Sequence, residues 1–180
     1  MEDVVLESAV VRLMRGDYRE WLQGLSPEEA NAIRKYSRNS IDKTPDSRFF
    51  ARLNCMLRHQ YNKEDSELLQ KYADIISVAL SRTPLKRNVL LYRGCDANPF
   101  AHLVLGSEVM MPQFLSTSVI KTRAFRGKYN LQIYAPIGTS GAYIEQLSAY
   151  PKQREFLLNA GCRLKLQDIE DDVYFLEVIV

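Results

Sequence analysis

The spacing of apolar residues along this chain changes once, near residue 87, from a helical period to short apolar runs. The clearest helix start is Ser26-Pro27-Glu28-Glu29, in which a serine N-cap precedes proline at the first helical position and glutamate at the third. Apolar residues recur at helical spacing after this start and in two later segments, which predicts amphipathic helices. These apolar faces contain Ala30, Ile33 and Tyr36; Phe49, Leu53, Met56 and Leu57; and Leu68, Leu69, Tyr72, Ile75, Ile76 and Leu80.

Beyond residue 87 the pattern predicts β-strands, because short runs of Val, Ile, Leu, Tyr and Phe are separated by Gly, Pro and Asn. Strand follows strand without an intervening helical segment, so antiparallel pairing is favoured over βαβ units. We therefore expect an α+β fold in which a helical N-terminal half packs on a mainly antiparallel β core. The predicted strands cover residues 88–92, 108–118, 129–134, 155–158, 163–166 and 173–180.

Length and composition narrow the class of protein. The chain has 180 residues, of which 46% are hydrophobic and 26% charged, so we expect one folded domain over residues 1–180 that acts as a monomer. A net charge of +2 gives little support to a nucleic-acid partner. The apolar runs are too short to cross a membrane.

Cysteine and histidine placement argues against a metal site. Cys55, Cys95 and Cys162 are odd in number and form no CxxC pair, and neither His59 nor His102 has a ligand partner at useful spacing. We expect reduced thiols and a cytosol-like working compartment. The acidic start of the chain is unlike a signal peptide, so we expect either that the chain acts where it is made or that a leader or delivery segment is missing.

Two strand ends carry polar groups suited to chemistry. Arg93 ends an apolar strand before Gly94, where its guanidinium could clamp an anion or simply face solvent or a carboxylate. Ser116-Thr117-Ser118 ends another strand, and alternation sends Ser116 and Ser118 to one face. Hydroxyls are common at strand ends, so this run alone favours a structural role.

A carboxylate and a helix pair complete the candidate set. Glu155 precedes the apolar run 156–158 and could be a solvated edge residue or a cleft carboxylate that stabilises a sugar cation. Asn54 and Arg58 are four residues apart and share one helix face, which by itself indicates a solvated face.

Together and in this order, the segments resemble the Arg-Ser-Glu class of mono-ADP-ribosyltransferases, the toxin type. That family has an aromatic-Arg pair ending its first core strand, a Ser-Thr-Ser strand and a catalytic Glu two residues after a Glu or Gln. Tyr92-Arg93, Ser116-Thr117-Ser118 and Gln153-Arg154-Glu155 match these elements. The resemblance covers about residues 25–180 and extends to Leu25-Ser26-Pro27-Glu28-Glu29, Leu53-Asn54-Cys55-Met56-Leu57-Arg58, Gly141-Ala142-Tyr143-Ile144 and Ser148-Ala149-Tyr150-Pro151.

The resemblance implies NAD as co-substrate, bound in a cleft between two small β sheets. Arg93 would bind its phosphates, and Ser116 would orient Glu155. Glu155 would hydrogen-bond the ribose 2′-hydroxyl and favour the cationic sugar as nicotinamide leaves, because a fixed carboxylate in a dry cleft stabilises positive charge better than water does. Further NAD-binding residues implied by the family are Asn54, Arg58, Gly94, Thr117, Ser118, Phe125 and Arg126.

The segment 122–126 falls where the family has a flexible loop over the nicotinamide. Phe125 would then stack on NAD, and Arg123 or Arg126 would reach a phosphate. A basic surface loop is an equally good interpretation of these residues.

Gln153 bears on the acceptor. Arginine-modifying members of the family carry Glu at this position, whereas an amide is neutral and suits an Asn or Gln acceptor or a hydroxyl. The Gln-x-Glu form resembles the C3-like exoenzymes, and Tyr150 matches the exposed aromatic residue of their substrate loop. Tyr150 could instead be a turn aromatic packed over the sheet edge.

The resulting prediction is an NAD-dependent protein mono-ADP-ribosyltransferase with a non-arginine acceptor, Tyr150 and Gln153 recognising the substrate. It would be a bacterial toxin or effector, secreted or injected, that acts in the host cytosol on a small GTPase, ubiquitin or another protein, without metal or membrane. The alternatives are an NAD glycohydrolase, an arginine-specific transferase, a transferase acting on nucleic acid, and a non-catalytic binding module.

Overall fold

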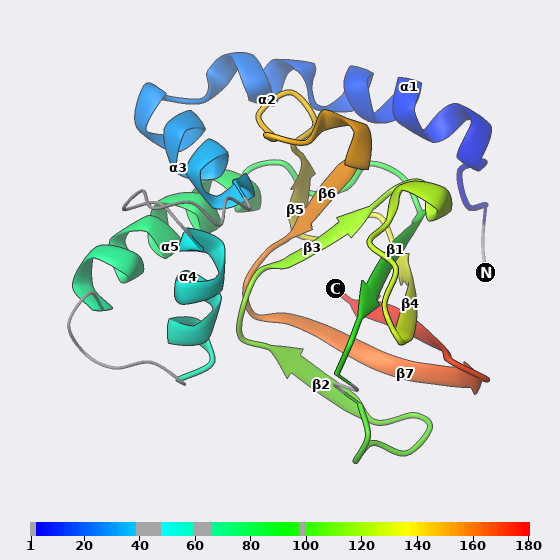
Figure 1. Ribbon diagram of the computed structural model, residues 1–180. Coiled ribbons are helices and arrows are strands. Elements are labelled where there is room, and N and C mark those ends of the chain that lie inside the picture. Colours follow the sequence, from blue (N-terminus) through cyan, green and yellow to red (C-terminus); the bar gives the residue numbers. More distant parts are fainter. Residues whose placement is uncertain (1–2, 39–47, 60–65, 98–99) are drawn as a thin grey trace.

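The change of pattern near residue 87 corresponds to a helical part followed by a β part in the computed structural model, which describes residues 3–38, 48–59, 66–97 and 100–180 (Figure 1). The helices are α1 (Glu7–Asp17), α2 (Arg19–Gly24), α3 (Pro27–Ser37), α4 (Phe49–Leu57) and α5 (Ser66–Ser81). Among the described residues, none of these helices combines the length and hydropathy needed to cross a bilayer.

The predicted start of α3 is confirmed. The Glu29 backbone N–H donates to Ser26 Oγ at 3.2 Å, and the Ser26 N–H donates to Glu29 Oε2 at 2.8 Å. This reciprocal capping satisfies two N–H groups that have no partner within the helix, and proline occupies the first turn, where its missing N–H costs nothing. Helices α1 and α2, by contrast, are not singled out by the sequence pattern.

Eight strands form one hydrogen-bonded order, β2-β7-β8-β4-β1-β3-β6-β5. Only the β4–β8 pair among them is parallel, in line with the mainly antiparallel prediction. The strands are β1 (Val89–Cys95), β2 (Glu108–Met111), β3 (Leu115–Ser118), β4 (Tyr129–Ala135), β5 (Gly141–Tyr143), β6 (Glu155–Leu158), β7 (Cys162–Glu170) and β8 (Val173–Ile179).

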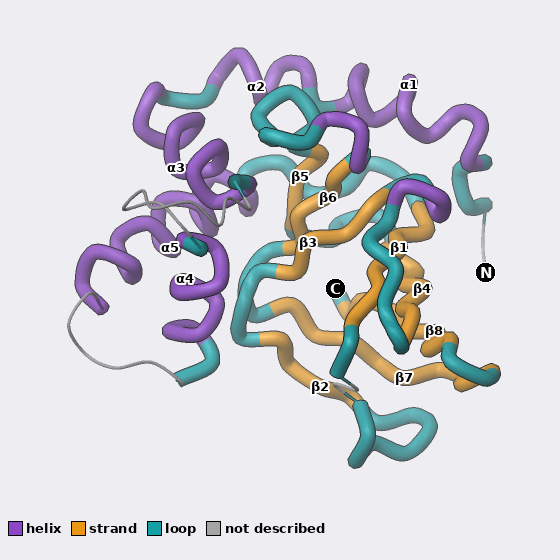
Figure 2. The backbone as a smooth tube through the Cα atoms, viewed as in Figure 1, coloured by secondary structure: helices purple, strands orange, loops and turns teal. Residues whose placement is uncertain are grey.

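The sheet has two parts that meet at a narrow joint. Strands β1 and β3 are joined by one register pair, Tyr92 with Ser118, whereas β1 and β4 pair along seven residues. Figure 2 shows β5, β6 and β3 as one group of strands and β4, β8, β7 and β2 as the other, with β1 between them. The two parts agree with the expected two-sheet core, although hydrogen bonds join them in one sheet, and Arg93 of β1 donates to the Ser116 carbonyl of β3 across the joint.

The predicted strand 108–118 is wrong in extent, because it is two strands. Residues 108–111 pair with β7 at one edge of the sheet, and residues 115–118 pair with β6 in its interior. Pro112 separates them and cannot donate a ladder hydrogen bond. The short strand β5 was also missed by the pattern.

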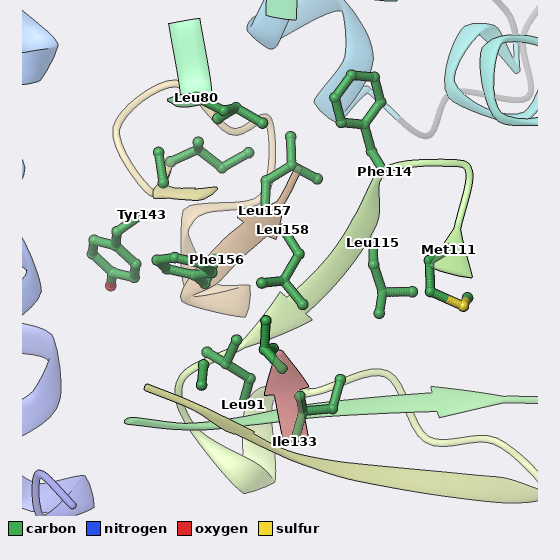
Figure 3. Close-up of a cluster of buried hydrophobic side chains, with 14 of the residues drawn as sticks. Leu80, Leu91, Met111, Phe114, Leu115, Ile133, Tyr143, Phe156, Leu157 and Leu158 are labelled. Carbon is green, nitrogen blue, oxygen red and sulfur yellow. The ribbon is translucent and has the colours of Figure 1, made fainter. Parts of the chain in front are cut away.

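The core lies between the helices and the sheet, and β6 is its most enclosed strand. All four residues of β6 are buried. Figure 3 shows Leu157 and Leu158 between Leu80 of α5 on one side and Leu91 and Ile133 of β1 and β4 on the other. A strand buried on both faces has an uninterrupted apolar sequence, and the one charged residue of β6, Glu155, stands at its beginning.

Candidate active site

A cleft of about 200 Å³ opens where the helical part meets the joint of the sheet. It brings together residues that are far apart in the sequence: Asn54 from α4, Arg93 from β1, Ser116 from β3 and Glu155 from β6. Two turns add Phe125, Tyr150 and Gln153, and the full lining is Tyr36, Ser37, Phe50, Asn54, Arg93, Gly94, Ser116, Phe125, Tyr150, Gln153 and Glu155.

Glu155 is the buried carboxylate of this cleft. It is 4% exposed, and its two oxygens accept hydrogen bonds from Ser116 Oγ (Oε1, 2.6 Å) and Ser148 Oγ (Oε2, 3.3 Å). Burial raises the pKa of Glu155, while the two hydroxyls and the positive charge of Arg93 act in the opposite direction. Charge stabilisation from this carboxylate would act in a partly dehydrated environment, where it is stronger than in water.

Arg93 lies across the joint of the sheet. Its Nη1 donates to the backbone carbonyl of Ser116 at 2.6 Å, which ties the side chain of β1 to the backbone of β3. A guanidinium held at a cleft wall presents a planar fork of donors suited to phosphate oxygens.

The α4 side of the cleft carries an acceptor without a partner. Asn54 Nδ2 donates to the hydroxyl of Tyr36 at 2.9 Å, and Asn54 Oδ1 is buried with no hydrogen-bond partner among the described residues. Such an orphaned atom in a ligand-sized cleft suits a hydroxyl donor. Arg58 lies at the C-cap of α4 with Nη2 3.4 Å from Cys55 Sγ, and it is not among the cleft-lining residues.

The remaining predicted residues lie around the cleft. Thr117 Oγ1 donates to the Phe156 carbonyl at 2.6 Å, and Ser118 Oγ donates to the Ile120 carbonyl at 2.9 Å. Both also line a small adjoining cavity of about 50 Å³ together with Arg93 and Gln153. Arg126 lines a neighbouring cavity of about 380 Å³, which shares Arg93 and Phe125 with the cleft.

The turn that carries Phe125 is packed directly on β1. Phe125 is 68% exposed and lines the cleft. A Cβ added at Gly94 would overlap the backbone of Phe125 and of Gly127, and one added at Gly127 would lie 2.5 Å from the backbone of Cys95. Glycine at both positions is therefore what allows this close approach.

The turn before β6 carries Tyr150 and Gln153. Tyr150 is 40% exposed and precedes the 3₁₀ turn Pro151–Gln153. Arg154 follows in the left-handed conformation (φ 53°, ψ 48°), which costs a residue with a Cβ about 1–2 kcal/mol. This reversal allows both Gln153 and Glu155 to line the cleft.

Sequence reasoning missed two groups that hold the site. Ser148 bonds Glu155, and Tyr36 bonds Asn54. The sequence pattern predicts Tyr36 only as part of an apolar helix face, and burial raises the pKa of its hydroxyl. Ser148 lies in the Ser148-Ala149-Tyr150-Pro151 segment, so the family resemblance pointed to its neighbourhood but not to its contact.

No group of three or more His, Cys, Asp or Glu side chains within the described part of the chain is arranged to hold a metal ion.

Comparisons with a family model, with curated proteins and with solved structures all point to ADP-ribosyltransferases. The model of a family described as ADP-ribosyltransferase exoenzyme matches residues 14–174. An Enterococcus faecalis protein named NAD(+)-arginine ADP-ribosyltransferase is 29% identical over 168 residues, which cover 88% of this chain and 32% of that protein.

The chain therefore spans about a third of the length of that curated relative. Among solved structures, Plx2a, an ADP-ribosyltransferase toxin from Paenibacillus larvae, superposes with a TM-score of 0.81 at 20% identity, over 98% of both chains. C3stau2 from S. aureus, solved with NAD, gives a TM-score of 0.74 at 19% identity, over 99% of this chain and 98% of that one. At these identities the superpositions establish the fold.

Proposed function

Since the chain belongs to the ADP-ribosyltransferase exoenzyme family, we propose that it is an NAD-dependent protein mono-ADP-ribosyltransferase of toxin type whose catalytic domain spans residues 1–180. The observation that carries this proposal is the buried Glu155 carboxylate, fixed by Ser116 and Ser148 in a cleft that also holds Arg93. Arg, Ser and Glu converge here from three different strands.

In the proposed reaction NAD supplies the ADP-ribosyl group and nicotinamide as leaving group. The bond between the ribose carbon and the nicotinamide nitrogen breaks with its electron pair going to nicotinamide, and the acceptor atom forms the new bond and releases one proton. Glu155 stabilises the positive charge that develops on the sugar, and Ser116 orients Glu155. Loss of such a carboxylate typically lowers the rate about 10²–10³-fold.

The cleft residues suit NAD. Arg93 offers a guanidinium for the phosphates, Asn54 Oδ1 offers an unused acceptor for a ribose hydroxyl, and Phe125 offers an exposed ring for stacking. Arg126 and Arg58 lie outside the cleft lining, and they would contribute only at its periphery.

We infer that the acceptor is a neutral side chain, such as the amide of Asn or a hydroxyl, rather than arginine. Gln153 lines the cleft beside Glu155 and carries no charge that could attract a guanidinium. The turn that carries Phe125, residues 119–128, contains four Lys or Arg and no Asp or Glu, so its field opposes a cationic acceptor. The arginine-specific alternative rests on the name of the Enterococcus faecalis relative.

The host protein that accepts ADP-ribose would meet Tyr150 and Gln153 at the cleft mouth, in the cytosol of a cell reached by secretion or injection. A direct test is to incubate the protein with biotin-NAD and a host-cell lysate and to identify labelled proteins and residues by mass spectrometry. A labelled band that disappears with Glu155→Ala, on an Asn, Gln, Ser or Thr side chain, is the expected result.

Four other outcomes of this test separate the alternatives. Labelling on arginine, or of free agmatine, would refute the neutral acceptor. Release of nicotinamide without any labelled protein would favour an NAD glycohydrolase. Labelled nucleic acid would favour a transferase that acts on nucleic acid. If the chain neither labels protein nor releases nicotinamide, the catalytic proposal fails.

A further inference from the structure

A cluster of three charged residues lies behind the turn that leads into β6, away from the cleft. Glu145 follows β5 and is 5% exposed. Its carboxylate accepts two hydrogen bonds from Arg15 of α1, from Nε at 2.9 Å and from Nη2 at 2.8 Å, and it forms an ion pair with Arg154. A carboxylate this buried needs paired charges, and here two guanidinium groups supply them.

The cluster connects distant parts of the chain. Arg15 lies in the last turn of α1, and Arg154 is the residue between Gln153 and Glu155. Figure 1 shows α1 running along the same side of the molecule as the orange segment that enters β6. The ion pairs therefore fasten the turn to a helix near the other end of the sequence.

Arg154 has the backbone conformation that decides where its neighbours point. Its left-handed φ and ψ follow the 3₁₀ turn, its N–H donates to the Pro151 carbonyl at 3.2 Å, and its carbonyl accepts from Val119 N–H at 3.1 Å. Residues with a Cβ stay in this conformation only where the surroundings enforce it. The side chain of Arg154, held by Glu145, is one of those constraints.

Gln153 and Glu155 depend on this constraint to different degrees. Glu155 is held by Ser116, by Ser148 and by the pairing of β6 with β3. Gln153 is exposed, and within the described residues its one hydrogen bond joins its N–H to the Tyr150 carbonyl at 2.9 Å. Loosening Arg154 would therefore free Gln153 while leaving Glu155 in place.

We propose that Arg15, Glu145 and Arg154 form a positioning cluster that fixes the Tyr150–Gln153 turn relative to Glu155, and thereby couples NAD cleavage to transfer onto the protein acceptor. The proposal rests on the proposed function, since it takes Gln153 to face the acceptor. None of the three residues lines the cleft, so none acts on NAD directly.

The decisive variant is Glu145→Gln, which keeps the side-chain shape and removes the charge that both arginines share. We expect transfer of ADP-ribose to the acceptor to fall about tenfold or more while nicotinamide release stays within about twofold of the wild type. Arg15→Gln, at a half-exposed side chain, should change the same ratio in the same direction but less.

A matched control exists on the same helix. Arg87 holds Asp17 of α1 by two hydrogen bonds of 2.7 and 3.2 Å, and within the described residues neither side chain bonds to the Tyr150–Gln153 turn. Arg87→Gln therefore removes an ion pair from α1 without touching the cluster, and its ratio of transfer to nicotinamide release should match the wild type. An equal loss of transfer in Arg87→Gln, or a parallel loss of both activities in Glu145→Gln, overturns the proposal.

A readout that does not need catalysis completes the test. Amides of residues 149, 150 and 152–154 should exchange with solvent about tenfold faster in Glu145→Gln, while those of β6 stay protected. Unchanged exchange in the turn would refute the positioning role of the cluster, even if the chain proves inactive. A wild type that releases no nicotinamide would refute the proposed function, and the exchange result would still test the cluster. If Glu145→Gln fails to fold, the same measurements on Arg15→Gln decide.

Discussion

The hydroxyl of Ser116 and the carboxylate of Glu155 are joined by a 2.6 Å hydrogen bond that runs diagonally between two strands, since Ser116 pairs with Leu157 and Glu155 pairs with Ser118. A second hydroxyl, from Ser148, binds the other carboxylate oxygen at 3.3 Å. The carboxylate is thus held from two sides, one in the sheet and one in the turn before β6, so its direction is set before any ligand arrives.

Replacing Ser116 by alanine should separate orientation from charge. We expect nicotinamide release to fall about 10- to 100-fold, because a misdirected carboxylate stabilises the sugar cation less well. The Ser116 bond also lowers the pKa of Glu155, so its loss raises that pKa further, and the acidic limb of the pH–rate profile should move to higher pH. An unshifted limb in a folded variant would show that Ser116 does not act on Glu155.

Glu155→Gln should abolish most activity and raise stability. Burial raises the pKa of Glu155 in the folded chain above its value in the unfolded chain. The resulting contribution to the free energy of unfolding is complete below the unfolded pKa and is lost as pH rises through the folded pKa. At neutral pH the wild type is destabilised by its buried negative charge, and the variant is not. The variant's melting temperature should therefore be higher, by on the order of 2–4 °C for each kcal/mol of destabilisation removed. The gain should shrink at acidic pH, and a gain independent of pH would contradict this account.

Asn54→Ala should weaken NAD binding more than catalysis. The unused Oδ1 acceptor is lost, so we expect KM for NAD to rise about fivefold to tenfold with little change in kcat, the effect of one hydrogen bond. Tyr36→Phe removes the hydroxyl that orients Asn54 but keeps Oδ1, and its effect on KM should be smaller. Equal effects in the two variants would assign the binding to the orientation of Asn54 and not to its oxygen.

Gly94→Ala should disturb the turn that carries Phe125. The added methyl overlaps the backbone of Phe125 and Gly127, so we expect about 1–3 kcal/mol of destabilisation together with slower nicotinamide release. Gly16→Ala in α1 is the matched control, since a Cβ there meets no atom within 4 Å and should stabilise the helix by about 0.5–1 kcal/mol. Urea unfolding of both variants measures the two energies, and similar values would contradict the packing argument.

Three polar residues that the sequence singles out line one cleft in the structure. Arg93, Ser116 and Glu155 could be chosen because polar residues at the ends of apolar strands are conspicuous and because their order resembles one family. The family and the α+β fold are confirmed. The individual roles of these residues stay predictions that the variants above test.

The contacts that hold the site were beyond sequence reasoning for physical reasons. Ser148 bonds a residue seven positions away and Tyr36 one eighteen positions away, and neither separation follows from a helix or strand period. The left-handed Arg154 is unfavourable for a residue with a Cβ, so propensity argues against it and only tertiary contacts explain it. The strand predicted over 108–118 failed because Pro112 lies within it and the segments on its two sides pair with different strands.

The joint between β1 and β3 affects how the width of this cleft could change among related chains. Arg93 stands on one side of the single Tyr92–Ser118 pair, while Ser116 and Glu155 stand on the other. The distance between Arg93 and Glu155 therefore depends on the twist at one backbone pairing and on the Arg93–Ser116 hydrogen bond that spans it. Chains that keep the same three residues can acquire clefts of different width through substitutions in the surrounding core, which would let specificity change while the reacting groups stay the same.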